Sequence, residues 1–147
     1  MTRNKLYTYL LFILATVALC STCSCTRNGG DIGVWFGTWT ITEVTADGTV
    51  VPPPAGSYFS VQFQGEIVVL TLTDERHTPA LRTYGNWTED GDQMQWLFPE
   101  QDMYFMPLPG LTRVNKFAIV EKSGKRVRLQ TVSESGVTYV YTLTKLV

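Results

Sequence analysis

The chain has 147 residues and carries 12 Lys and Arg against 13 Asp and Glu, a formal net charge of −1. This balance excludes a typical nucleic-acid-binding surface, which needs basic residues clustered on one face. Hydrophobic residues make up 44% of the chain, enough for one domain of ordinary size with a packed core.

Residues 1–24 predict a signal peptide. Arg3 and Lys5 form a basic start, and the apolar run from Leu6 to Leu19 follows them. The run is shorter than the ~20 residues that a membrane-spanning helix needs, so the segment reads as a targeting signal outside the fold. Without Arg3 and Lys5, 10 basic side chains remain against 13 acidic ones, a net charge of −3.

All three cysteines of the chain, Cys20, Cys23 and Cys25, lie just after this apolar run. A disulfide within so short a stretch would constrain almost nothing, and no further ligands are near to complete a zinc site. The stretch resembles a bacterial lipoprotein signal, in which a cysteine after a small residue is lipidated. Cys25, which follows Ser24, fits best, Cys23 fits less well, and a plain cleaved signal is the alternative.

Residues 25–34 then predict an anchor followed by a flexible tether. Several acyl chains on one cysteine would hold the protein stably on a membrane. The tether has no acidic run of the kind associated with surface export in some gut-dwelling bacteria. We therefore expect a lipid-anchored protein of the bacterial cell envelope, on the outer membrane and facing the periplasm.

The remainder, residues 35–147, predicts an all-β domain. Apolar and polar residues alternate with period two, and no convincing helical period occurs. The expected strands are 37–44, 57–64, 66–73, 81–88, 93–98, 115–122, 125–132 and 137–147. For the strand 115–122 there are two alternatives: the buried face carries either Phe117 and Ile119 or Ala118 and Val120. Glycine-containing turns separate most strands and indicate antiparallel neighbours. Eight such strands predict an up-and-down barrel, with a two-sheet sandwich as the alternative.

Two connections are longer than tight turns. Three prolines at 52–54 impose an extended path on the first. The second, residues 99–113, carries Tyr104, Phe105 and Met106 between prolines, although most loops are polar. We expect this second connection either to plug one end of the barrel or to line its mouth.

The segment WFGTWTITEV, with Gly37 and Trp39 as G-x-W, resembles the first strand of lipocalins and of the short lipocalin-like domains common in Bacteroidetes lipoproteins. The resemblance implies an eight-stranded barrel in which Trp39 closes the base and Gly37 bends the chain beneath it. It also implies a cation near the last strand that stacks on Trp39, and Lys145 is the residue available. The T-D-Y pattern and the C-terminal helix of classical members are absent, which favours the reduced group.

Catalytic chemistry is not indicated. His77 is the one histidine of the chain and lies in a polar turn, and no serine has a G-x-S-x-G context. We expect no enzyme activity, no metal site and no cofactor.

The predicted function is binding of a small hydrophobic ligand inside the barrel. The ligand would contact inward aromatic residues and the apolar loop, namely Trp39, Phe63, Trp87, Trp96, Tyr104, Phe105 and Met106. Plain core packing is the competing interpretation of the inward rings. The alternative function is a protein-interaction module or accessory subunit that uses the 99–113 loop, with a filled barrel.

Overall fold

The computed structural model describes residues 30–99 and 107–146. A short 3-10 turn, η1 (Gly30–Trp35), precedes nine strands. The strands are β1 (Gly37–Ala46), β2 (Thr49–Val50), β3 (Tyr58–Gln64), β4 (Ile67–Thr73), β5 (Pro79–Asp90), β6 (Gln93–Leu97), β7 (Val114–Lys122), β8 (Arg126–Val132) and β9 (Thr138–Lys145). The predicted signal peptide with Cys23, residues 25–29 of the predicted anchor and tether with Cys25, and Tyr104, Phe105 and Met106 lie outside the described residues.

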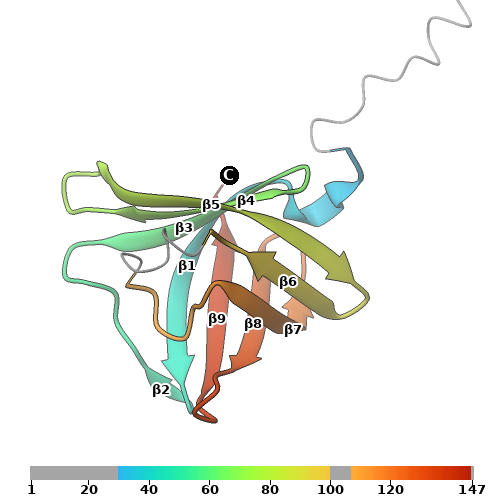
Figure 1. Ribbon diagram of the computed structural model, residues 1–147. Helices are drawn as coiled ribbons and strands as arrows, with labels where there is room; N and C mark the ends of the chain where they lie inside the picture. The colour runs from blue at the N-terminus through green and yellow to red at the C-terminus, as the bar shows by residue number, and fades with distance from the viewer. Residues whose placement is uncertain (1–29, 100–106, 147) are drawn as a thin grey trace, which may run out of the picture. The chain divides into compact units, whose positions relative to one another are not determined.

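Eight of the strands form a closed antiparallel up-and-down barrel (Figure 1). Each strand pairs with the next along the chain, and β1 closes the barrel against β9, from Trp39 opposite Lys145 to Ala46 opposite Tyr139. The remaining strand, β2, lies outside the barrel; it has two residues and pairs with the end of β1. Because β1 pairs with β9, the sheet is closed, which confirms the predicted barrel and excludes the two-sheet sandwich.

Local turn chemistry accounts for this order. Between β1 and β2, Asp47 and Gly48 both have positive φ, 47° and 82°, as a two-residue hairpin loop of the I′ type requires. Gly65 and Gly91 also have positive φ, in the β3–β4 and β5–β6 turns. Such short loops force consecutive strands to lie side by side, which makes the meander the natural topology.

The core is the set of inward residues that period-two alternation predicts. On β3 these residues are Phe59, Val61 and Phe63, each at most 2% exposed. On β7 the first of the two open alternatives holds, because Phe117 is buried and Ile119 packs against the core, whereas Val120 is half exposed. The barrel is therefore filled mainly by inward side chains of its own strands.

A β-bulge interrupts this alternation in β1. Ile41 pairs with Leu143 and Glu43 with Thr142, so Thr42 is an extra residue in β1. The bulge shifts the inward position by one, and Val44 is buried where strict alternation would have buried Glu43. An acidic side chain is thus kept outside the core.

The two ends of the barrel are built differently (Figure 1). One end, on the right of the figure, carries η1 and the tight turns after β3, β5 and β7. The other end carries the β1–β3 connection with β2, the turn after β4 and the long connection between β6 and β7. We call these ends the closed end and the mouth. Within the described residues no helix is both long and apolar enough to cross a bilayer.

Candidate functional site

Two tryptophans fill the closed end. Trp35, the last residue of η1, is 1% exposed, and Trp39 on β1 is fully buried. The indole N–H of Trp39 donates to the Trp35 carbonyl oxygen at 3.0 Å, and the two ring centroids are 6.4 Å apart. Gly37 between them has φ +113°, a conformation that favours glycine. The sequence predicted the bend and the buried Trp39, but it gave no role to Trp35.

Two lysines hold this end together. Lys145 Nζ donates to the Val34 carbonyl oxygen at 3.1 Å and lies 5.3 Å from the centroid of Trp39, which confirms the predicted cation–π pair. Lys122 Nζ lies 5.1 Å from the Trp35 centroid and forms an ion pair with Glu89. Glu89 in turn accepts a hydrogen bond of 2.8 Å from the indole N–H of Trp35. Side chains from three strands thereby tie η1 to the barrel.

The four predicted ligand contacts that the structure describes all lie in the packed interior. Phe63 is 5.0 Å from Trp87 and 6.0 Å from Trp96, measured between ring centroids, and Trp35 is 5.3 Å from Phe63. Trp96 also contacts Phe117 at 4.7 Å. Phe63, Trp87 and Trp96 are therefore packed around one another, and Trp39 belongs to the same core cluster through its contact with Trp35. None of the four lines the pockets described below.

At the mouth, the residues that lead into β7 are pinned to the barrel. Leu108 is 3% exposed within the core, and the Tyr141 hydroxyl donates to the Pro109 carbonyl oxygen at 2.6 Å. Burial, with a smaller contribution from Tyr139, raises the pKa of Tyr141 above its usual range, so the hydroxyl stays protonated and able to donate. Gly110 has φ +77° and lies so close to the Tyr139 ring that a Cβ would collide with it.

A second attachment lies two residues further on. The amide of Asn115, buried at the start of β7, accepts from Thr112 N–H at 2.7 Å and donates to the Thr112 carbonyl at 2.6 Å. Phe98 N–H donates to the Arg113 carbonyl at 2.9 Å, which joins the two sides of the connection. The described part of the predicted apolar loop thus folds back onto the mouth.

An apolar crevice of about 160 Å³ lies beside this attachment. Its floor consists of buried side chains from β1, β3 and the mouth connection, namely Ile41, Val44, Phe59 and Leu108. Residues 50–53, with two of the three consecutive prolines, form its outer wall. Thr42, Glu43 and Pro109 complete the lining.

The crevice lies where the barrel wall divides. The first half of β1, from Gly37 to Ile41, pairs with β3. The end of β1, at Thr45 and Ala46, pairs instead with β2. Val51 N–H still donates to the Val44 carbonyl at 2.8 Å, but residues 52–57 return to β3 outside the ladder, because the prolines at 52–54 have no N–H to donate. A lateral seam between β1 and β3 remains, lined by apolar side chains.

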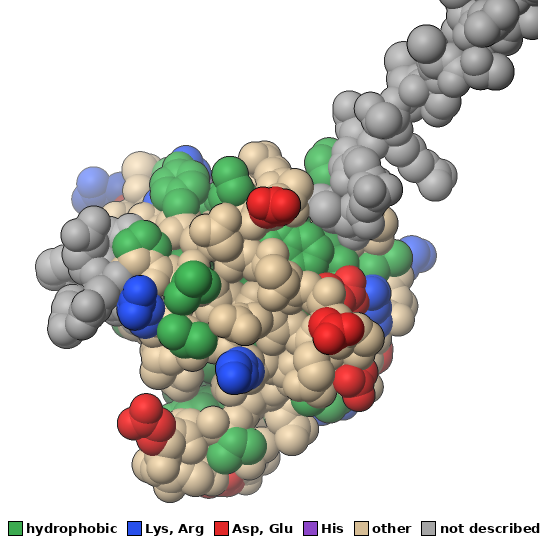
Figure 2. All heavy atoms as spheres, turned by 45° about the vertical axis from the view of Figure 1, so that its right-hand side comes forward, with side chains coloured by type: hydrophobic (Ala, Val, Ile, Leu, Met, Phe, Trp, Pro, Cys, Tyr) green, Lys and Arg blue, Asp and Glu red, His purple; other side chains and the backbone are tan. Residues whose placement is uncertain are grey.

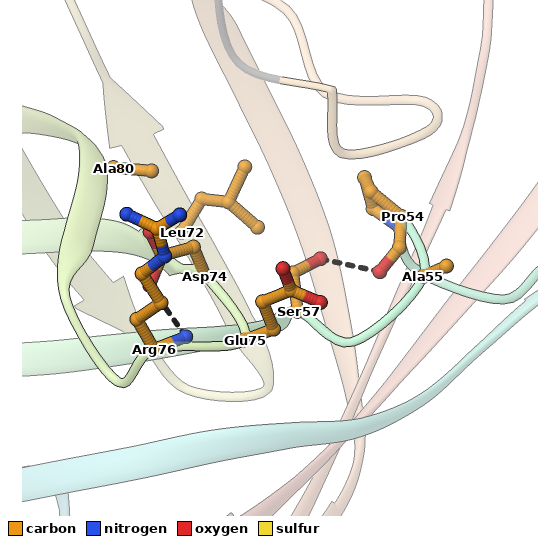
Figure 3. A pocket seen from close by; sticks show the side chains of 8 residues that line it. All are labelled: Pro54, Ala55, Ser57, Leu72, Asp74, Glu75, Arg76 and Ala80. Carbon is orange, nitrogen blue, oxygen red and sulfur yellow. Dashed lines mark hydrogen bonds between the residues drawn. The ribbon is translucent and has the colours of Figure 1, made fainter.

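A larger hollow of about 430 Å³ lies on the rim (Figure 3). It runs between Pro54 to Ser57 on one side and the β4–β5 turn on the other, and it carries exposed charges of both signs from Glu75 and Arg76. Asp74 is engaged in the turn itself, because its Oδ1 accepts from the backbone N–H groups of Arg76 and Thr78. We therefore regard the smaller apolar crevice as the better candidate for an apolar ligand.

Other chemistry-bearing groups are dispersed. His77 is exposed in the β4–β5 turn with φ +58°, and its ring centroid is 6.5 Å from that of Tyr58. Over residues 30–99 and 107–146, no three His, Cys, Asp or Glu side chains are grouped so as to hold a metal ion. Thr83 Oγ1 is buried on β5 with no hydrogen-bond partner in the described part of the chain. It does not line the crevice.

Sequence reasoning missed the crevice. Period-two alternation places Ile41 and Phe59 on the apolar faces of their strands, and the prolines at 52–54 predict an extended path; neither pattern indicates a binding site. The available signal was the combination of prolines next to a two-residue hairpin, which prevents β3 from pairing along the whole of β1. Leu108 belongs to the apolar connection 99–113 that we expected to plug one end of the barrel or line its mouth, and it is buried there.

Comparison of the sequence with family models finds no match, and comparison with curated proteins finds none either. The fold has clear counterparts. A lipocalin-like protein from Bacteroides uniformis ATCC 8492 superposes with a TM-score of 0.60 at 15% identity, over 78% of this chain and 100% of that one. An uncharacterized protein from Bacteroides eggerthii DSM 20697 gives a TM-score of 0.60 at 17% identity, over 76% of this chain and 99% of that one.

These similarities and the geometry together define the kind of protein. The chain forms a closed eight-stranded up-and-down β-barrel with one end filled by aromatic rings and the other approached by long connections. More particularly, it has the lipocalin-like fold seen in Bacteroides proteins, as its G-x-W first strand led us to expect. At this level of identity the likeness establishes the fold alone.

Proposed function

We propose that this protein is a membrane-anchored, non-enzymatic binding protein for a small hydrophobic ligand. The observation that carries the proposal is the apolar crevice at the mouth, floored by Ile41, Val44, Phe59 and Leu108. A concave apolar surface with a few polar groups at its edge is the usual form of a small-ligand site. The packed aromatic interior supports a position at the mouth rather than among Trp39, Phe63, Trp87 and Trp96.

Binding can be tested with benzyl alcohol, a neutral probe with one apolar ring. Titrated into the isotopically labelled protein, it should saturably shift the NMR resonances of Ile41, Val44, Phe59 and Leu108. A probe of this size binds weakly, in about the millimolar range. Val50→Trp places a large side chain on the crevice wall from an exposed position and should abolish the shifts.

The matched control is Val120→Trp, because Val120 is also an exposed strand valine, 49% accessible, but does not line the crevice. This variant should bind benzyl alcohol as the unmodified protein does. Absence of saturable shifts in the unmodified protein would refute the proposal. Equal binding by Val50→Trp, or shifts confined to the rim hollow around Glu75 and Arg76, would place the site elsewhere.

The anchoring part of the proposal rests on Cys25, which follows a small residue after a signal-like apolar run. Cys25→Ser should move the protein from the membrane fraction to the soluble fraction of the envelope, whereas Cys23→Ser should leave it membrane-bound. If only Cys23→Ser released the protein from the membrane fraction, Cys23 would be the lipidated residue instead of Cys25. Unchanged fractionation of both variants would argue against a lipid anchor.

A protein-interaction module is the second candidate function, and an exposed apolar row on the barrel wall favours it. Ile67, Asn86, Leu97 and Val114 are successive cross-strand neighbours on β4 to β7. The three apolar members are 46%, 39% and 43% exposed. Figure 2 shows several hydrophobic side chains exposed on one face of the molecule, interspersed with acidic and basic side chains. Such a row suits the edge of a protein interface.

Cross-linking in intact envelopes would test this second candidate. If the row contacts a partner, Leu97→Lys should remove a cross-linked complex that Val120→Lys, a change of the same kind outside the row, leaves intact. No difference between the two variants would remove the row from consideration.

A further inference from the structure

The size of the crevice sets the size of the apolar group that it can hold. Its volume is about 160 Å³. A cavity of ~150 Å³ lined by aliphatic and aromatic residues accommodates one benzene molecule. The crevice therefore matches a single six-membered ring or a short branched chain, and the rest of a larger ligand would remain outside the lip.

The part of a ligand that remains outside the crevice would lie beside a charged residue, and the bulge in β1 determines which residue this is. Because Thr42 is an extra residue, Glu43 is turned away from the core and lies exposed at the edge of the crevice. Among the described residues that line the crevice, Glu43 carries the one charged side chain. No salt bridge of Glu43 occurs in the described part of the chain, so its carboxylate is available to a ligand.

We infer that the crevice selects amphiphiles that combine one aromatic ring or short branched chain with a cationic end, and disfavours those that end in a carboxylate. This inference rests on the proposed function, since it names the ligand class of the same site. A cationic end at the lip lies beside the Glu43 carboxylate, and a carboxylate end is repelled by it. A neutral polar end is unaffected by that charge.

Three probes that share one ring test the inference: benzylammonium, benzyl alcohol and benzoate. At low ionic strength benzylammonium should bind about two- to ten-fold more tightly than benzoate, as expected for an exposed charge pair. Benzyl alcohol should fall between them. The difference should shrink in 0.5 M salt, because the Debye length there is well under ~8 Å.

Glu43→Gln should bring the affinities of benzylammonium and benzoate together and leave that of benzyl alcohol unchanged. The matched control is Glu66→Gln, which makes the same change in net charge at an exposed residue of the β3–β4 turn, at the closed end. In Glu66→Gln the ratio of the benzylammonium affinity to the benzoate affinity should remain that of the unmodified protein. This control separates the local effect of Glu43 from the overall negative charge of the protein.

The outcomes distinguish the two proposals. If benzyl alcohol binds at the crevice but benzoate binds as well as benzylammonium, the charge inference is overturned and the proposed function stands. The inference also fails if Glu66→Gln alters the ratio as much as Glu43→Gln does. If none of the three probes binds, the proposed function and the inference fall together.

Discussion

The closed end and the mouth of this barrel use similar residues to opposite effect. At the closed end, Trp35, Trp39, Phe63 and Trp87 fill the space, and the strands are joined by tight turns. At the mouth, apolar residues and prolines are arranged around an unfilled crevice at a division in the wall. The difference indicates that aromatic content alone does not locate a binding site. What distinguishes the mouth is incomplete strand pairing.

If the closed end carries most of the stability, its fully buried tryptophan, Trp39, should be the most costly side chain to remove. Trp39→Ala leaves a cavity among packed rings and should lower the free energy of unfolding by about 3–5 kcal/mol, measured by urea denaturation. Tyr84→Ala is the control, because Tyr84 is 52% exposed on β5, and it should cost little. Similar losses in the two variants would contradict a packed closed end.

A smaller loss is expected where the mouth connection leaves the barrel. A Cβ at Gly85 would lie 2.5 Å from the Leu97 carbonyl oxygen and 2.6 Å from the Phe98 ring. Gly85→Ala should therefore cost about 1–3 kcal/mol through overpacking, seen as a lower denaturation midpoint. Gly124→Ala, at a position with no atom within 4 Å, is the control and should be close to neutral. A neutral Gly85→Ala would mean that the mouth packs loosely even at its base.

The hydrogen bond from Tyr141 to Pro109 should contribute least of the three, about 1 kcal/mol, and Tyr141→Phe measures it. The pH dependence adds a sharper signature. Because the folded pKa of Tyr141 is raised, its contribution is fully present below the unfolded value of about 10 and is lost as the pH rises above it. The variant should lose less stability than the unmodified protein between pH 10 and 11, in parallel chemical denaturations. An equal alkaline loss would show that Tyr141 does not titrate with unfolding.

The sequence was most informative where structure is local. Turns such as Asp47-Gly48 and alternation such as that of Phe59, Val61 and Phe63 depend on neighbouring residues, so the eight strands and their inward faces could be predicted. The bulge at Thr42 depends on how β1 meets β9, which is about 100 residues away in the chain, and no local pattern announces it. Trp35 lies before the first strand and carried no periodic signal.

The candidate site was the less predictable part for the same reason. The inward rings of Trp39, Phe63, Trp87 and Trp96 could be identified from alternation, but whether they enclose space depends on how their volumes fit together across the barrel. In the structure Phe63 contacts Trp87 and Trp96, and Trp39 contacts Trp35, so the rings fill the interior. The crevice depends on two long connections and one division in the wall, none of which is specified within a single strand.

The bond from Lys145 to Val34 also bears on how the protein would be presented to its surroundings. It fixes the point where the chain enters the barrel at the closed end, opposite the crevice. From there back to the proposed anchor at Cys25 the chain can extend at most ~30 Å. If Cys25 carries a lipid, as proposed above, the tether would join the barrel at its closed end, and the crevice would lie at the end of the barrel away from the point of attachment.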